Sequence, residues 1–348
     1  MELIPAIQAP GRKGAKEWNI LKSIWTGAKN LEIDSYSLSL PPVSDKILLS
    51  AFYCMKYHRN ESIAKALGFS TTKIYMDSGG YQVLTKGVSM DPTELIRYQE
   101  TNADVAFTID VPLPKGLPVA DISDNVRRTI QYAVTMVDAR MNPSLKLYAV
   151  VHALSYDDAR KVTSQYEKHP FDGYAVGSLV PRKNKYELMA EVIAGVRSAT
   201  DRPTHVFGIS GFNSIYLLAR LRVDSYDSQT FVQASRFREY IVPQLAKRVS
   251  VGRGGGKTRK ISSTLPCSCP ICQIANQEGG ATFFSKEGSH CDALLAIHNL
   301  IAMKEENTLI NAALTEGWLE QLIKDRTRDS KSMQEAWRSI EKRLIRNV

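Results

Sequence analysis

Lys73-Ile-Tyr-Met-Asp77-Ser-Gly-Gly-Tyr-Gln82 is the stretch of sequence that decides the fold. A short β-branched and aromatic run ends in an acid, and the two glycines after it let the backbone turn sharply. Runs of the same kind recur about every 20 to 40 residues, at residues 46–52, 73–76, 105–109, 146–151, 173–176, 204–208 and 223–226. Each run is predicted to be one strand of a sheet.

Helical patterns lie between these predicted strands. Residues 92–102 are expected to form a helix that Asp91 caps and Pro92 begins, and further helices are expected at residues 122–141, 156–168 and 185–199. Strands that alternate with helices indicate parallel pairing through crossover helices. A doubly wound sheet and a (β/α)8 barrel both fit this alternation.

Polar residues at the ends of the predicted strands separate the two architectures. A doubly wound sheet binds its ligand at one switch point, whereas a barrel collects ligand residues from the C-terminal ends of many strands. Here the residues at strand ends are Asp77, Asp110, His152, Gly177, Ser178, Gly208 and Asp227. The sequence therefore predicts an α/β protein built on a (β/α)8 TIM barrel.

A second signal is Cys267-Ser-Cys269-Pro-Ile-Cys272, followed by a distant His298. Thiolate and imidazole ligands together suit tetrahedral zinc, and four protein ligands close a structural site. Reduced or disulfide-bonded cysteines are the other interpretation. No apolar signal segment opens the sequence, so we expect a reducing cytoplasm, which disfavours disulfides.

The fourth ligand follows from helix geometry. Residues 289–307 are predicted to form a helix, on which Cys291 and His298 lie seven residues apart. At the rise of an α-helix that separation is about 10 Å, so one ion does not take both. We expect His298 to be the ligand, with His290 and Cys291 as minor candidates.

Composition points to a polyanionic partner. The 348 residues are 43% hydrophobic, enough for a sizeable core, and carry a formal net charge of +9. No membrane partner is expected, because no stretch approaches the roughly 20 apolar residues of a membrane span. Basic residues concentrate late in the chain, and those predicted to contact nucleic acid are Arg236, Arg238, Arg253, Lys257, Arg259 and Lys260. The alternative for the glycine-rich part of this segment is a solvated linker.

Three of the strand-end residues are aspartates, Asp77, Asp110 and Asp227. They form a natural set for chemistry on a glycosidic bond, since one carboxylate can capture an anomeric carbon, a second can move the proton, and a third can read a base. The alternative is that some of them cap helices.

With these motifs the chain resembles the tRNA-guanine transglycosylase family, over about residues 40 to 305. The resemblance is carried by residues 77–82, 171–179, 205–209 and 224–228, together with the three cysteines and His298-Asn299. It implies a TIM barrel with an inserted subdomain that binds a structural Zn²⁺. The expected domains are a catalytic barrel at 1–261, a zinc-binding subdomain at 262–306, and a basic helical segment packed on the barrel at 307–348.

The resemblance also implies roles for individual residues. Asp227 matches the nucleophile and Asp77 the proton-transfer acid/base of a retaining exchange of guanine for a 7-deazaguanine. Asp110 matches the acid that reads the guanine, and Tyr81 and Phe207 fall where the base is sandwiched. The full set of expected substrate-binding residues is Tyr81, Gln82, Asp110, His152, Gly177, Ser178, Phe207 and Gly208. The target base must be flipped out or single-stranded.

Departures from the family pattern bear on the substrate. His152 stands where a guanine-reading glutamine is usual, Ser178 replaces a second glycine, and the segment after Asp227 differs from that of the tRNA enzymes. We therefore expect the DNA-modifying, DpdA-type branch, which places a 7-deazaguanine such as the 7-cyano form into DNA. A divergent tRNA enzyme and a catalytically silent zinc-bearing partner subunit are the alternatives.

The expected partners are thus DNA, with tRNA as the alternative, and a free 7-deazaguanine base. The cytoplasm is the expected location, or the host cytoplasm if the protein is phage-encoded, and a homodimer is compatible with the resemblance. His152 is expected to select the incoming base by donating to O6 or to the 7-substituent. A metal-dependent hydrolase is disfavoured, because His58, His169 and His205 are not placed at strand ends.

Overall fold

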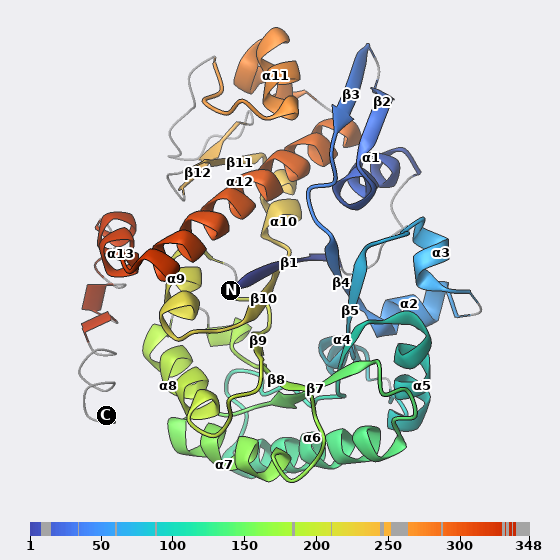
Figure 1. Cartoon of the computed structure of the whole chain (residues 1–348), viewed down its shortest axis with the longest axis vertical. Coiled ribbons are helices and arrows are strands. Elements are labelled where there is room, and N and C mark those ends of the chain that lie inside the picture. Colours follow the sequence, from blue (N-terminus) through green and yellow to red (C-terminus); the bar gives the residue numbers. More distant parts are fainter. Residues whose placement is uncertain are drawn as a thin grey trace.

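Eight parallel strands close into a barrel in the order β1-β10-β9-β8-β7-β6-β5-β4, and this confirms the predicted TIM barrel (Figure 1). The computed structural model describes residues 1–7, 15–33, 35–59, 61–87, 89–182, 185–209, 211–243, 247–251, 264–286, 288–328, 331, 334–335 and 337–338. The strands of the barrel are β1 (Glu2–Ile7), β4 (Lys46–Ser50), β5 (Lys73–Asp77), β6 (Val105–Phe107), β7 (Lys146–Val151), β8 (Gly173–Val176), β9 (Thr204–Val206) and β10 (Ser225–Ser228).

The strand that closes the barrel, β1, is absent from the sequence-based prediction. It pairs with β10 over Glu2 to Pro5 and then with β4 through Ala6 and Ile7. Proline within an apolar run argues against a strand because it cannot donate to the ladder. Pro5 is accommodated here because it lies where the pairing passes from one neighbour to the other.

Helices cover the outside of the barrel. The predicted helices are present, and the cap of α5 is as expected, since Asp91 Oδ1 accepts a hydrogen bond from the Glu94 amide at 2.8 Å. The helices of the barrel and its loops are α1 (Ala15–Thr26), α2 (Ala51–Tyr57), α3 (Ile63–Leu67), α4 (Gly80–Lys86), α5 (Pro92–Asn102), α6 (Val119–Ala139), α7 (Tyr156–Tyr166), η1 (Val180–Arg182), α8 (Tyr186–Arg197), α9 (Phe212–Arg220) and α10 (Thr230–Arg236).

The alternation of side chains along the strands fills the barrel and prepares its open end. A cluster inside the barrel is formed by Ile4, Ala6, Leu48, Tyr75, Val105, Phe107, Val150 and Ala175. Because side chains two residues apart share a face, Asp77 follows Tyr75 and His152 follows Val150 on the inner face. These two side chains therefore stand at the C-terminal ends of their strands, where barrel enzymes build their sites.

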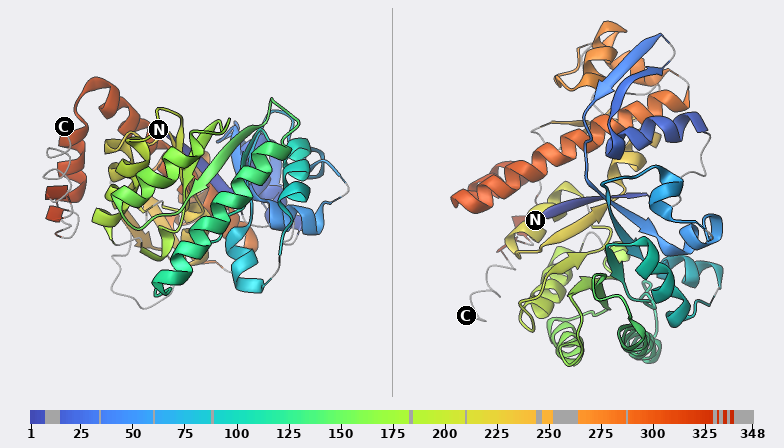
Figure 2. Two further views of the ribbon diagram at one scale, coloured as in Figure 1. Left: turned by 90° about the horizontal axis from the view of Figure 1, so that it is seen from below. Right: turned by 45° about the vertical axis from the view of Figure 1, so that its right-hand side comes forward.

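A second layer lies across one side of the barrel. It contains the hairpins β2 (Ala28–Ile33) with β3 (Tyr36–Leu40) and β11 (Glu239–Val242) with β12 (Lys247–Ser250), and the helices α11 (Pro270–Gln277) and η2 (Gly280–Ser285). The last two helices are α12 (Ser289–Glu316) and α13 (Leu319–Thr327). The long helix α12 runs between the barrel and this layer (Figures 1 and 2). It packs against α1, α9 and α10 of the barrel and against α11, η2 and β11 of this layer.

The helix predicted at 289–307 is therefore longer than expected, and the proposed domain boundary at 306/307 falls inside it. Within the described residues, no helix has both the length and the apolar character needed to cross a membrane.

Candidate active site and metal cluster

Asp77 occupies the last position of β5, directly before a left-handed turn at Gly79. The Gly79 amide donates a hydrogen bond to Asp77 Oδ1 at 2.8 Å. Burial raises the pKa of Asp77 to about 7, and the nearby carboxylates of Asp227 and Asp110 act in the same direction, whereas the Gly79 hydrogen bond opposes them. Asp77 can therefore both release and accept a proton near neutral pH.

Asp227 lies on β10 and is only 7% exposed. Its Oδ1 accepts a hydrogen bond from the Gly208 amide at 2.8 Å and faces Nε2 of His205 at 3.4 Å. Gly208 has φ of 64°, a conformation that favours glycine. The turn after β9 thus presents its backbone amide to the carboxylate of the neighbouring strand.

Asp110 is held by two side chains from neighbouring strand ends. Ser78 Oγ donates to Asp110 Oδ1 at 2.9 Å, and His152 Nε2 lies 2.9 Å from Asp110 Oδ2. The other ring nitrogen of His152 lies 2.9 Å from Ser178 Oγ, and the imidazole is 1% exposed. Both ring nitrogens are therefore engaged by protein groups, and His152 supports Asp110 in this structure.

The turn after β8 is shaped around His152. A Cβ on Gly177 would lie 2.5 Å from His152 Cε1, so only glycine fits there. The Gly177 amide donates to Val151 O at 3.0 Å. It is thus committed to the sheet and is not free to address a substrate.

Ser178 has φ of 60°, a strained conformation for a residue with a side chain. Its hydroxyl oxygen accepts a hydrogen bond from the Leu113 amide at 2.7 Å in addition to its contact with His152. Arg182 donates to Leu113 O at 2.7 Å and to Ser178 O at 2.8 Å. These bonds join the loops that follow β6 and β8 and offset the strain at Ser178.

Phe207 and Tyr81 are the two aromatic residues expected around the base. The Phe207 ring lies 4.7 Å from Phe107 and 5.0 Å from His205, measured between centroids, and is half-buried at the top of the barrel. The prediction for Tyr81 falls on a side chain outside the described part of the structure. Gln82, on α4, is buried beside Gly79.

The predicted basic surface is described only in part. Arg236 is exposed, whereas Arg238 donates to Phe284 O and forms an ion pair with Asp292, both at 2.8 Å. Arg238 is thus tied to the layer that carries the cysteines. The remaining four predicted residues, Arg253, Lys257, Arg259 and Lys260, lie outside the described residues.

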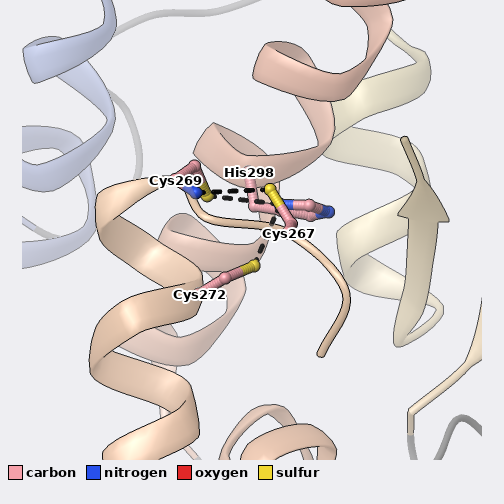
Figure 3. Close-up of side chains that lie close together, drawn as sticks. All are labelled: Cys267, Cys269, Cys272 and His298. Atoms are coloured by element: carbon pink, nitrogen blue, oxygen red, sulfur yellow. Dashed lines mark hydrogen bonds between the residues drawn. The ribbon is translucent and has the colours of Figure 1, made fainter. Parts of the chain in front are cut away.

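Cys267, Cys269, Cys272 and His298 converge at the start of α11 and on α12 (Figure 3). Their sulfur and nitrogen atoms all lie within 4.8 Å of one another. All five cysteines of the chain are free thiols, so the disulfide interpretation is wrong. Cys291 is buried elsewhere, with its thiol 3.6 Å from Phe283 O.

The surroundings of His298 fit a metal ligand. Its Nε2 lies 3.0 Å from the carbonyl oxygen of Ile241 and must donate to it, which leaves the Nδ1 lone pair directed at the sulfurs of Cys269 and Cys272. The Tyr240 ring stacks on the imidazole at a centroid distance of 4.0 Å. The cluster can therefore hold a metal ion, and its donors are those that zinc prefers.

His205 is the residue that sequence reasoning missed. The sequence does not place it at a strand end, yet it lies on β9 with its ring 3.4 Å from Asp227 and 2.9 Å from Ser225. The sequence did contain a signal for it. Side chains two residues apart on a strand share a face, so His205 lies on the same face as Phe207, which was expected in the site.

Comparisons with known proteins found a matching family model and several similar enzymes. The model of a protein family described as Queuine tRNA-ribosyltransferase matches residues 21–332. The chain is similar to the tRNA-guanine(15) transglycosylase of Methanocaldococcus jannaschii, with 27% identity over 317 residues that make up 86% of this chain and 46% of the relative. It is also similar to the enzyme of that name from Thermococcus onnurineus, with 27% identity over 97% of this chain and 58% of the relative.

The chain thus spans about half the length of the curated relatives it matches. The family match covers the barrel strands from β4 to β10, the cysteine cluster and α12, and it begins after β1.

Proposed function

Because the chain belongs to the Queuine tRNA-ribosyltransferase family, we propose that it is a guanine transglycosylase, a pentosyltransferase that exchanges guanine in a polynucleotide for a free base of the 7-deazaguanine type. The observation that carries the proposal is the placement of two aspartates at one end of the barrel, each with its Oδ1 held by a backbone amide. Burial raises the pKa of Asp77 to about 7.

The proposed reaction is a double displacement with retention at the sugar. Asp227 attacks the anomeric carbon, and the glycosidic bond breaks as Asp77 gives its proton to the departing guanine. The incoming base then loses a proton to Asp77 and displaces the aspartyl ester. A raised pKa suits Asp77 to both proton transfers, since the group must exchange its proton in each half of the cycle.

Asp110 is proposed to recognise the guanine through its carboxylate oxygens. Each oxygen already accepts one hydrogen bond, from Ser78 or from His152, and a carboxylate oxygen has a second lone pair for a donor on the base. Guanine offers such donors at N1 and at its exocyclic amine. Gln82, Ser178, Phe207 and Gly208 complete the proposed pocket.

We assign zinc to the cluster of three cysteines and His298. The four side chains fill a tetrahedral shell and leave no open position for a water molecule, so the metal is proposed to be structural. The ion would join α11 to α12 and, through His298 and Ile241, to β11. This fixes the layer that carries Arg238 beside the barrel.

Between the polynucleotides, the relatives favour tRNA, because those of Methanocaldococcus jannaschii and Thermococcus onnurineus are named as tRNA-guanine(15) transglycosylases. We therefore take tRNA as the first substrate and DNA as the second. The observation that favours DNA is the arrangement around Asp110, where His152 and Ser178 stand in place of the glutamine and glycine of the tRNA enzymes. A cytoplasmic location is part of the proposal, supported by five free thiols.

The test is incorporation of labelled guanine, and separately of 7-cyano-7-deazaguanine, into tRNA, single-stranded DNA and duplex DNA. Asp227→Asn serves as the matched control in every arm. Incorporation into tRNA alone supports the first substrate, and incorporation into DNA alone supports the second. Absence of incorporation into all three by the wild-type protein contradicts the proposed activity.

A further inference from the structure

The two oxygens of the Asp227 carboxylate have different surroundings. Oδ1 accepts the Gly208 amide at 2.8 Å and faces His205 Nε2 at 3.4 Å. Within the part of the chain that the structure describes, Oδ2 has no hydrogen-bond partner. The protein therefore fixes one oxygen and leaves the other available.

His205 cannot turn away from this oxygen. It is 0% exposed, and its ring lies 4.9 Å from that of Phe107 and 5.0 Å from that of Phe207. Its other nitrogen, Nδ1, lies 2.9 Å from Ser225 Oγ, and the two residues are direct register partners on β9 and β10. Packing and hydrogen bonding together aim Nε2 at Asp227.

From this geometry we infer that His205 is a positioning residue for the nucleophile: with the Gly208 amide it holds Asp227 Oδ1, and it thereby makes Oδ2 the attacking oxygen. The inference rests on the proposed function and deepens it. Ser225 contributes by fixing the orientation of the imidazole.

Both halves of the reaction then depend on the same hydrogen bonds. In the first, the bond from Oδ2 to the anomeric carbon forms while the glycosidic bond breaks, and its electron pair leaves with guanine N9, which Asp77 protonates. Oδ1 becomes the carbonyl oxygen of the ester and keeps its donors. In the second, the bond from Oδ2 breaks as the incoming base attacks, and the charge that returns to the carboxylate is stabilised at Oδ1 by His205 and Gly208.

Two substitutions at one position separate the hydrogen bond from packing. His205→Leu removes the donor but keeps an apolar side chain against Phe107 and Phe207, whereas His205→Gln keeps an amide donor near the place of Nε2. His169→Gln is the matched control, because His169 lies in the loop that leads into β8, at the opposite end of the barrel. Guanine exchange is measured with each variant, together with the amount of covalent protein–nucleic acid adduct on a denaturing gel.

We expect His205→Leu to lower kcat about tenfold, as for the loss of one hydrogen bond to a charged group, with the KM for the base nearly unchanged. His205→Gln is expected to recover most of the rate, and His169→Gln to match the wild type. A purely structural role for His205 would not produce rescue by glutamine at unchanged KM.

A wild-type kcat in His205→Leu overturns the inference while the proposed function stands. If both His205 variants fail to fold, Ser225→Ala replaces them, since it frees the imidazole without opening the core; an unchanged kcat then overturns the inference. Failure of the wild-type protein to exchange guanine in any polynucleotide is a different result, and it removes the proposed function together with this inference.

Discussion

His152 Nε2 lies 2.9 Å from Asp110 Oδ2, and the imidazole that makes this contact is almost fully buried. Its other nitrogen is taken by Ser178 Oγ. A histidine in this position orients Asp110, the proposed base-reading acid, from behind. We therefore propose an indirect role for His152, in place of the expected donation to O6 or to the 7-substituent.

His152→Gln tests that role. We expect the KM to rise about tenfold for 7-cyano, 7-aminomethyl and unsubstituted bases alike, because the variant loosens Asp110, which contacts a part of the base that all three share. The KM and kcat of each base are measured separately. A changed order of preference among the three bases would show that His152 contacts the 7-substituent directly.

Asp227→Asn is expected to lower exchange by about a thousandfold or more, because an amide cannot form the glycosyl ester. The fold should survive, since the asparagine oxygen can still accept the Gly208 amide. Adduct formation on a denaturing gel and the thermal unfolding temperature are the two measurements. Persistent adduct with unchanged mobility would assign the nucleophile to another residue.

Asp77→Asn is expected to stabilise the protein at high pH while abolishing exchange. The pKa of Asp77 is about 7 in the folded state, against an unperturbed value of 3.8. Ionising the wild-type side chain therefore lowers the unfolding free energy. This loss grows as the pH rises from 3.8 and reaches its full size above pH 7. The variant's gain in unfolding free energy should therefore increase by about 2–3 kcal/mol between pH 5 and pH 8. Denaturant unfolding of both proteins at the two pH values measures it, and a gain independent of pH contradicts the raised pKa.

His298→Ala is expected to abolish metal binding and to lower the unfolding free energy by about 3 kcal/mol or more, because the free energy of metal binding is lost from folding. Elemental analysis should find one zinc per wild-type chain and none in the variant. His290→Ala, on the same helix but outside the cluster, is the control and should retain the metal. If His298→Ala retains zinc, the fourth ligand is His290 or Cys291 and not His298.

The sequence was informative where the signal is local. The stretch from Lys73 to Gly80 holds a β-branched and aromatic run, an acid and a glycine turn within a few residues, and the structure has a strand and a half-buried carboxylate there. The strand β1 was not predicted for an equally local reason. Proline disfavours a strand, and the sequence alone does not show which strands pair with the residues around Pro5.

The contact between His205 and Asp227 was beyond such reasoning. The two residues lie on adjacent strands, and their approach depends on the register of β9 against β10, which pairs His205 with Ser225. Nothing in either stretch alone specifies that register. The hydrogen bond from the Gly177 amide to the carbonyl oxygen of Val151 likewise depends on the register of two neighbouring strands.

By itself the sequence determined the alternation of strands and helices, the strand-end positions of Asp77 and His152, and the set of residues that converge on the metal cluster. These follow from backbone geometry and from the chemistry of side chains close in the chain. Only the tertiary structure decided that β1 closes the barrel, that His152 serves Asp110, and that Asp227 is held through one oxygen. Each of these is a pairing between distant segments, and its energy arises only when the barrel has fixed their register and excluded water from between them.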